Sequence, residues 1–237
     1  GQDKTILEVP YITEEHKVWE SVSLQLTSLY GNRACKEYKD CYSNFHLPSE
    51  RIPQFFEINK TLSGHGFSLE PVAGLVTPKE FLTKLSEGSM LCTQYIRHYS
   101  VPEYTPEPDI IHELFGHAVF LLSEKIRRIN YLFGKVAKQA SDKEIESLIR
   151  LYWHTVEFGL CLEDNVPKAV GAGLLSSVKE LSSVCDIPTK PFHIPTMINT
   201  SYDTMNPQPF LFCAPSFDFM INELTLYLNN CLQRTNK

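Results

Sequence analysis

The chain has 237 residues, of which 43% are hydrophobic, enough for one substantial core or at most two small ones. Its formal net charge of −6 argues against a nucleic-acid-binding protein, which would carry a basic stripe. No stretch approaches the roughly 18 apolar residues that a membrane span needs. The seven cysteines are scattered singly without a CxxC pair, a pattern typical of reduced thiols. We therefore expect a cytoplasmic protein that binds neither nucleic acid nor membranes.

Helical periodicity begins near the N-terminus. Trp19, Val22, Leu26 and Leu29 recur at helical spacing, and Gly31 is a plausible terminator after them. The pattern predicts an amphipathic helix that ends at this glycine.

A short helix is predicted between two strands in the next part of the chain. Thr77 can cap a helix that has Pro at its first position and Glu80 at its third, which predicts a helix over 78–86. The flanking runs 66–72 and 89–96 have the composition of short strands.

The second half of the chain predicts two longer helices and one strand. Ser141 and Glu144 form a capping pair before an amphipathic run, and Ser216 can cap a last helix over about 217–232. Residues 208–213 favour a strand. Pro- and Gly-bearing loops are predicted at 47–54, 101–108, 164–174 and 186–209.

Two histidines, His112 and His117, lie five positions apart in an apolar setting and predict a metal site. On a regular α-helix, positions five apart point about 140° away from each other. Both imidazoles could therefore reach one metal only if the first lies where a helix is just starting. Pro106 and Pro108 exclude an upstream helix, and Asp109 is a good helix cap.

A third ligand is needed, and Glu157 is the best candidate because its stretch, 151–161, is too apolar for a solvated carboxylate. Two imidazoles and one carboxylate leave coordination positions open, as in non-heme Fe(II) oxygenases. A single buried histidine is more often a hydrogen-bonded core residue, and Glu157 alone would fit an internal salt bridge equally well.

The pair His112-Glu113 also invites comparison with zinc metalloproteases. Those enzymes use HExxH, in which histidines four apart bind zinc and the glutamate polarises a water. The extra residue here breaks that geometry on a regular helix. A zinc hydrolase is therefore the second interpretation.

Five ordered blocks resemble the catalytic domain of the pterin-dependent aromatic amino acid hydroxylases. The blocks are Cys92–His98, Tyr104–Asp109, His112–His117, Tyr152–Leu160 and Gly171–Ser177. The resemblance covers roughly residues 20 to 220. It implies a mainly α-helical fold with a few short β-strands and long irregular loops. It further implies a single catalytic domain over 1–237, with a flexible N-terminus over 1–13 and neither a regulatory nor a tetramerisation domain. This organisation is similar to that of the single-domain bacterial phenylalanine 4-hydroxylases, so we expect a monomer.

The resemblance also implies a set of site residues. Fe(II) would be held by His112, His117 and Glu157. A tetrahydropterin, tetrahydrobiopterin or a related reduced pterin, would lie among Gly74, Leu75, Val76, Phe81, Glu113 and Tyr152, of which the last two would also be catalytic. The aromatic amino acid would contact Arg97, Thr105, Pro108, Asp109, Trp153, Phe158, Gly173 and Ser176, with Arg97 binding its carboxylate and Asp109 orienting Arg97. O₂ would be the co-substrate.

The implied activity is hydroxylation of an aromatic ring, with phenylalanine converted to tyrosine as the first expectation. Trp153 is shared by the phenylalanine- and tyrosine-using members of the family, whereas the tryptophan hydroxylases tend to carry Phe there. Thr204, near a position that varies with the substrate, matches none of the usual residues. Tyrosine or tryptophan hydroxylation, relaxed specificity and a non-catalytic pterin or amino-acid binder stay open as alternatives.

The chain departs from the family pattern at several positions: Ser86-Glu87-Gly88, Leu91, His154 and Val170. The first two lie on the expected pterin side. His154 follows Trp153 directly, and because its helix position lies off the direction of Glu157, we expect its imidazole to face solvent rather than compete for the metal.

Overall fold

The computed structural model describes residues 8–74, 76–102, 107–204 and 206–234. Two expected site residues, Leu75 and Thr105, lie outside these ranges. The α-helices are α1 (Thr13–Arg33), α2 (Lys36–Asn44), α3 (Phe55–Leu62), α4 (Pro78–Leu85), α5 (Glu124–Gln139), α6 (Asp142–Tyr152), α7 (Ala172–Leu175), α8 (Val178–Ser183), α9 (Ile194–Met197) and α10 (Phe217–Arg234). Two 3₁₀ turns, η1 (Ser63–His65) and η3 (Phe120–Leu122), and two π-helical segments, η2 (His112–Ala118) and η4 (Trp153–Glu157), complete the helical part.

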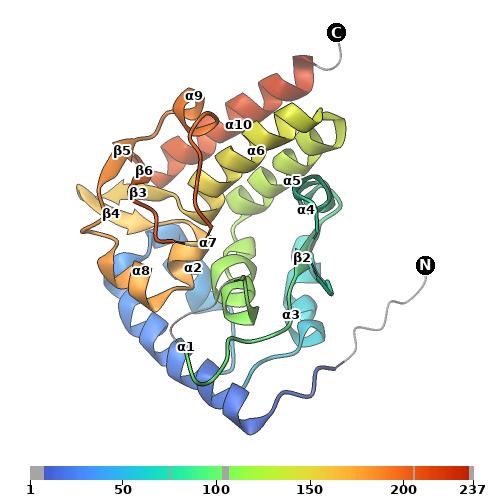
Figure 1. Ribbon diagram of the computed structural model, residues 1–237, viewed down its shortest axis with the longest axis vertical. Helices are drawn as coiled ribbons and strands as arrows, with labels where there is room; N and C mark the ends of the chain where they lie inside the picture. The colour runs from blue at the N-terminus through green and yellow to red at the C-terminus, as the bar shows by residue number, and fades with distance from the viewer. Residues whose placement is uncertain (1–7, 75, 103–106, 205, 235–237) are drawn as a thin grey trace.

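The strands form two small sheets. In one, β1 (Ser68–Pro71) pairs in parallel with β2 (Ser89–Cys92). In the other, the order is β4 (Val166–Ala169), β3 (Leu160–Glu163), β6 (Leu211–Ala214), β5 (Thr189–Pro191), with β3 antiparallel to β4 and β6 parallel to both β3 and β5. Asp164 and Asn165, at φ 51° and 60°, make the two-residue turn between β3 and β4, which suits the right-handed twist of a hairpin. Figure 1 shows this sheet along one side of the molecule.

The predicted helix starts are confirmed by their caps. Thr77 Oγ1 accepts a hydrogen bond from the N–H of Glu80 at the start of α4. The N–H of Ser141 donates to the carboxylate of Glu144 at the start of α6. Ser216 Oγ accepts from the N–H of Phe219 at the start of α10. The end predicted for α1 is short by two residues, because the helix continues through Gly31 to Arg33.

The strand predictions are partly right. β1 lies within the predicted 66–72, β2 covers only the first half of 89–96, and β6 begins three residues later than 208–213. Two loop predictions are wrong: 164–174 includes β4 and most of α7, and 186–209 includes β5 and α9. Turn-forming residues mark the hairpin between β3 and β4, and a four-residue strand beside them carries too little periodicity to be recognised.

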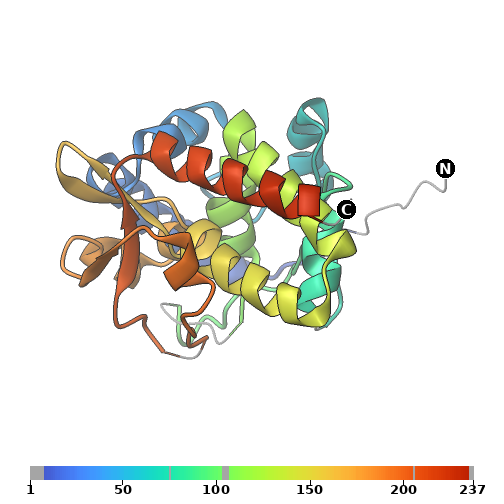
Figure 2. The ribbon, with the colours of Figure 1, turned by 90° about the horizontal axis from the view of Figure 1, so that it is seen from above.

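Helices α5, α6 and α10 lie side by side at one end of the molecule (Figures 1 and 2). Helix α5 also packs closely on α4, where a Cβ on Gly134 would lie 2.3 Å from the backbone nitrogen of Ser86. Only glycine allows the two backbones to approach this closely. The departure from the family pattern at Ser86 thus lies at a tight contact between two helices.

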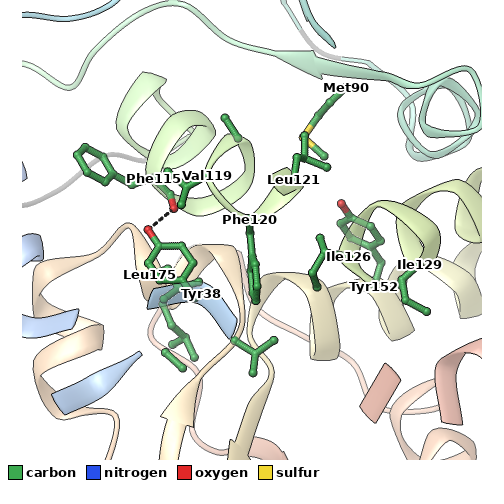
Figure 3. Packing of buried hydrophobic residues seen from close by; sticks show 14 of the residues in the cluster. Tyr38, Met90, Phe115, Val119, Phe120, Leu121, Ile126, Ile129, Tyr152 and Leu175 are labelled. Carbon is green, nitrogen blue, oxygen red and sulfur yellow. Dashed lines mark hydrogen bonds between the residues drawn. The ribbon is translucent and has the colours of Figure 1, made fainter. Parts of the chain in front are cut away.

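The π-helical segment η2 is buried in the hydrophobic core. Phe115 of η2, and Phe120 and Leu121 of the turn η3 that follows it, are at most 3% exposed and pack among side chains from α2, α5 and α7 (Figure 3). The hydroxyl of Tyr38, from α2, donates a hydrogen bond of 2.7 Å to the carbonyl oxygen of Phe115 (Figure 3). A residue of α2 thereby gives a carbonyl of the π-helical turn a partner from outside the helix.

The predicted fold class, mainly α-helical with a few short strands and long irregular loops, is confirmed. None of the helices in the described part of the chain has the length and apolar character to cross a membrane.

Replacing Tyr38 by Phe removes the hydroxyl that serves the buried Phe115 carbonyl. We expect the free energy of unfolding to fall by about 1–2 kcal/mol, because an unsatisfied buried acceptor costs that much. Urea denaturation measures the change. Tyr42→Phe is the matched control, since the Tyr42 hydroxyl bonds Thr27 at the surface, and it should change stability by less than about 0.5 kcal/mol. Equal effects of the two variants would contradict the assignment.

Candidate metal centre and adjoining pocket

The two histidines share a face because the helix between them is π-helical. The N–H of Val119 donates to the carbonyl of Leu114, five residues back, rather than four. A turn closed by such bonds holds more residues than an α-helical turn, so side chains five apart lie near each other. We expected the geometry of a regular α-helix to separate His112 and His117, but the segment that carries them is π-helical. His112 does lie where this segment begins, as predicted.

Three donor atoms converge at this point. Nε2 of His112 and Nε2 of His117 are 3.1 Å apart, and the carboxylate of Glu157 lies 3.1 Å from His117 Nε2 and 3.5 Å from His112 Nε2. Ligand atoms about 2.1 Å from one metal ion are roughly 3.0 Å apart at right angles and roughly 3.4 Å apart in a tetrahedron. The spacing fits a single cation held by two imidazoles and one carboxylate.

Glu157 reaches the histidines from a second π-helical segment, η4, whose end is marked by the bond from the N–H of Phe158 to the carbonyl of Trp153, 2.8 Å long. The chain after β4 supports it from behind. A Cβ on Gly171 would lie 2.2 Å from the carbonyl oxygen of Glu157, so only glycine fits there. Sequence reasoning missed Gly171 as a site residue, because nothing in its surroundings shows which backbone it approaches.

Burial and mutual attraction set the protonation of the three groups. Burial lowers the pKa of His112 and favours its neutral form. Burial, the largest single cause, would raise the pKa of Glu157. The attraction and hydrogen bond of His117 and the attraction of His112 together outweigh it, so the pKa of the carboxyl is lowered. For His117, burial opposes protonation but Glu157 prevails, and the pKa is raised. A divalent cation would displace the proton between Glu157 and His117 and find an anionic carboxylate with two imidazole donors.

Ser176 fixes the tautomer of His112. Its Oγ donates to the carbonyl of Ala172 at 2.7 Å, so it must accept at 3.1 Å from Nδ1–H of His112. With the proton on Nδ1, the lone pair of Nε2 faces Glu157 and His117, as a metal ligand requires. Ser176 was expected to contact the substrate; the structure places its hydroxyl against a candidate ligand.

Glu113 also lies close to the histidines, and one ligand atom from each of His112, Glu113 and His117 falls within a 4.8 Å cluster. Oε1 of Glu113, however, accepts hydrogen bonds from the backbone N–H and the hydroxyl of Thr93, at 3.0 and 3.2 Å. Glu157 approaches both imidazoles more closely and faces them directly. We therefore take Glu157 as the third candidate ligand and Glu113 as a residue at the edge of the centre.

Tyr152 is the last residue of α6, directly before η4 and five residues before Glu157. Its hydroxyl donates to Oδ1 of Asn130 at 3.0 Å, and its ring meets that of Phe81 edge to face at 5.7 Å. Burial raises the pKa of the Tyr152 hydroxyl well above its usual value, which keeps it protonated. The partner Asn130, on α5, was not foreseen, because a buried asparagine within a helix gives no signal of what it bonds.

The expected pterin-side residues lie around α4. Phe81 is half-buried on this helix, and Gly74 and Val76 belong to the loop that leads into it. Gly74 has φ +111°, a conformation that favours glycine. The structure thus brings Phe81 to Tyr152, the residue directly before η4.

On another side of the centre, Arg97 and Asp109 form a buried ion pair. Nε and Nη2 of Arg97 donate to the two carboxylate oxygens at 2.8 and 2.9 Å, and the side chains are 5% and 0% exposed. Oδ1 of Asp109 also accepts from the N–H of His112 at 3.2 Å, which confirms Asp109 as the helix cap. One carboxylate therefore orients Arg97 and begins the segment that carries the histidines.

Three aromatic side chains next to Glu157, those of Trp153, Phe158 and Tyr202, pack together and are called here the aromatic wall. The ring of Trp153 lies 4.6 Å from that of Phe158 and 4.3 Å from that of Tyr202. A Cβ on Gly173 would lie 2.5 Å from the tip of the Phe158 ring, so a larger residue at position 173 would displace that ring. Pro108, the remaining expected contact, is exposed, and its carbonyl accepts from the hydroxyl of Thr93.

The expectation for His154 is wrong. Its side chain is 6% exposed rather than solvent-facing, and Nε2 donates to the carbonyl of Thr200 at 3.1 Å. It also takes no part in the metal centre. The ring packs edge to face on Phe212 instead, because the sheet covers this side of η4.

Comparisons with known proteins show the family of this chain. The family model for biopterin-dependent aromatic amino acid hydroxylases matches residues 2–236. The chain belongs to this family. It is 41% identical to a tyrosine 3-monooxygenase of Schistosoma mansoni over 94% of this chain and 50% of that one, and 45% identical to a chloroplastic phenylalanine 4-monooxygenase of Pinus taeda over 74% and 50%.

Among solved structures, this member of the family resembles the phenylalanine hydroxylase of Chromobacterium violaceum with bound iron(III) and 7,8-dihydrobiopterin. The TM-score is 0.83 and the identity 28%, over 93% of this chain and 84% of the other. The chain spans about half the length of the curated relatives it matches. The predicted family resemblance is confirmed.

Replacing Ser176 by Ala removes the acceptor that holds Nδ1–H of His112. We expect Fe(II) to bind about 10–100-fold more weakly, the usual cost of losing a partner of a metal-bound histidine. Titration of the metal-free protein, followed by calorimetry, measures this. Ser182→Ala, which changes an exposed hydroxyl bonded to Lys179, should leave the affinity unchanged. Unaltered affinity in the Ser176 variant would show that the hydroxyl does not orient the ligand.

Proposed function

We propose that this chain is a non-heme Fe(II)- and tetrahydropterin-dependent monooxygenase that hydroxylates the ring of an aromatic amino acid. The observation that carries the proposal is the convergence of His112, His117 and Glu157 within 3.5 Å of one another in a chain of this family. A zinc hydrolase of the HExxH type would need histidines four residues apart, and the π-helical turn is built for five.

The metal would be held by the three converging side chains, with coordination positions left open. When bound, the reduced pterin would supply two electrons and the iron would activate O₂, the oxidant, so that one oxygen atom is placed on the ring and the other is reduced to the level of water. The residues of this chain position the partners. Glu113 and Tyr152 would line the space between the metal and the pterin. The Phe81 ring on α4, which meets that of Tyr152, offers an aromatic face on which a flat heterocycle can pack. Gly74, Leu75 and Val76 would complete that side.

Arg97 would bind the carboxylate of the substrate. Asp109 accepts hydrogen bonds from Nε and Nη2 of Arg97, and among the described residues Nη1 of Arg97 makes no hydrogen bond. A guanidinium held in this way presents its remaining N–H groups in a fixed direction. Asp109 also caps the segment that carries the histidines. The position of the substrate carboxylate on Arg97 would therefore be fixed relative to the metal.

The aromatic wall would receive the ring and exclude water from the reacting atoms. Trp153 and Phe158 supply the apolar surfaces, Gly173 leaves room beside Phe158, and Pro108 and Thr105 would complete the pocket. We propose phenylalanine as the substrate and tyrosine as its product, which the similarity to phenylalanine 4-monooxygenases supports. The similarity to a tyrosine 3-monooxygenase keeps tyrosine as the alternative, and a product assay with each amino acid separates them.

We also propose that the 237-residue chain is a monomer in the cytoplasm. All seven cysteines are free in the structure, which suits a reducing compartment. The net charge of −6 disfavours binding to nucleic acid or to anionic membranes. Light scattering after size-exclusion chromatography tests the oligomeric state.

Removing a candidate ligand tests the centre directly. Glu157→Ala and His112→Ala should both lose iron and reduce pterin-dependent product formation below detection, while circular dichroism shows a folded protein. Metal analysis coupled to oxygen consumption, with and without tetrahydropterin, gives the readout. The control Glu146→Ala alters an exposed carboxylate on α6 and should retain full turnover. A protein that carries zinc and consumes no oxygen would support the hydrolase, and one that binds pterin without oxygen uptake would support the non-catalytic binder.

The role of Arg97 has its own test. Arg97→Lys keeps the charge but loses the planar fork, so we expect the KM for the amino acid to rise about tenfold or more while the KM for pterin stays constant. Steady-state kinetics with each substrate varied in turn measures both constants. Arg128→Lys, at an exposed position of α5, is the control. An equal rise of both KM values would point to a general loss of structure rather than to carboxylate binding.

A further inference from the structure

A segment without helix or strand, residues 200–204, follows α9 and its terminal turn and passes the aromatic wall. Three side chains from the end of α6 and from η4 hold residues 198–204, called here the wall segment. The contacts join Arg150 Nη1 to the carbonyl of Ile198 at 3.3 Å, His154 Nε2 to the carbonyl of Thr200 at 3.1 Å, and the ring of Trp153 to that of Tyr202 at 4.3 Å. Alternate residues of the wall segment are thus anchored by side chains from the end of α6 and the start of η4.

The middle anchor is the imidazole of His154. A carbonyl oxygen can only accept, so Nε2 of His154 carries the proton in this bond. The ring lies 5.0 Å from that of Phe212 at 72°, which places it between the sheet and the wall segment. Burial lowers the pKa of His154, so the neutral form with its single donor prevails near neutral pH. A phenyl ring could fill the same space, but it could not donate.

The third contact, between Tyr202 and Trp153, fixes the position of the indole ring. Tyr202 stacks on the indole with an interplanar angle of 16°, and Trp153 Nε1 makes a longer bond of 3.4 Å to Gln208. The side chain of Gln208 in turn donates to the carbonyl of Asp203 at 2.6 Å. The wall segment and Trp153 therefore hold each other, and a shift of the segment moves the indole against Phe158.

We infer that His154 is a positioning residue for the substrate pocket: through Thr200 it fixes the wall segment, and through Tyr202 it sets the distance between Trp153 and Phe158 and hence which aromatic amino acid the pocket accepts. The inference rests on the proposed function, because it assumes that the ring of the substrate lies against this wall. It assigns His154 no contact with the substrate or the metal.

The test compares His154→Phe, which keeps an aromatic ring but loses the donor, with His154→Gln, whose amide nitrogen reaches about as far as Nε2. For the Phe variant we expect the KM for phenylalanine to rise about fivefold with kcat and iron content unchanged, and the ratio of kcat/KM for phenylalanine to that for tyrosine to change. The fold-change corresponds to the loss of one ordinary hydrogen bond. The Gln variant should restore the wild-type values.

The matched control is His193→Phe, the same exchange at an exposed histidine that precedes α9 and bonds Thr196. It should leave KM and selectivity at the wild-type values. A His154→Phe variant with unchanged KM and selectivity, or a Gln variant that behaves like the Phe variant, would overturn the inference.

Hydrogen exchange of the amides of residues 199–204, measured without substrate, separates this inference from the proposed function. Faster exchange in the Phe variant and normal exchange in the Gln variant would support the anchor. Unchanged exchange in the Phe variant would contradict it. Absent pterin-dependent turnover in the wild-type protein would instead contradict the proposed function.

Discussion

The site depends on the π-helical turn. Both segments that supply the candidate ligands, η2 and η4, use a wider turn that brings residues five apart onto one face. In η2 the turn joins His112 to His117, and at η4 it places Tyr152 and Glu157 on the same side of the chain. Such turns are less favourable than α-helical ones and are retained where function requires them. Burial in the core, together with outside partners such as Tyr38, offsets that cost.

A single buried carboxylate connects the candidate metal centre with the candidate site for the substrate carboxylate. Asp109 caps the segment that carries the histidines and also accepts two hydrogen bonds from the guanidinium of Arg97. In a buried setting such a pair is rigid, because breaking either bond would leave a charge without its partner. The direction from the candidate metal to the candidate carboxylate site is therefore a property of the fold rather than of a mobile loop.

The aromatic wall is built differently. Its Trp153 ring stacks on Tyr202 of the wall segment, which has no helix or strand from residue 200 to 204. Hydrogen bonds from Arg150 and His154 to backbone carbonyls hold that segment. Contacts of this kind are weaker and more easily altered than the ion pair of Arg97. The candidate metal ligands thus lie on helical segments and Arg97 is fixed by a buried ion pair, whereas the surface that would receive the ring depends on the few anchors from α6 and η4.

The sequence by itself determined the helix caps, the apolar character of the stretch around Glu157 and the set of residues that the family pattern places at the site, because caps and motifs are local signals. It could not show that η2 and η4 are π-helical, since that choice follows from core packing around both segments rather than from local propensity. It also misjudged His154, whose burial comes from a sheet formed by strands distant in sequence. Only the tertiary structure decided that Ser176 sets a tautomer, that Gly171 supports Glu157 and that Asn130 holds Tyr152, because each partner comes from a different part of the chain.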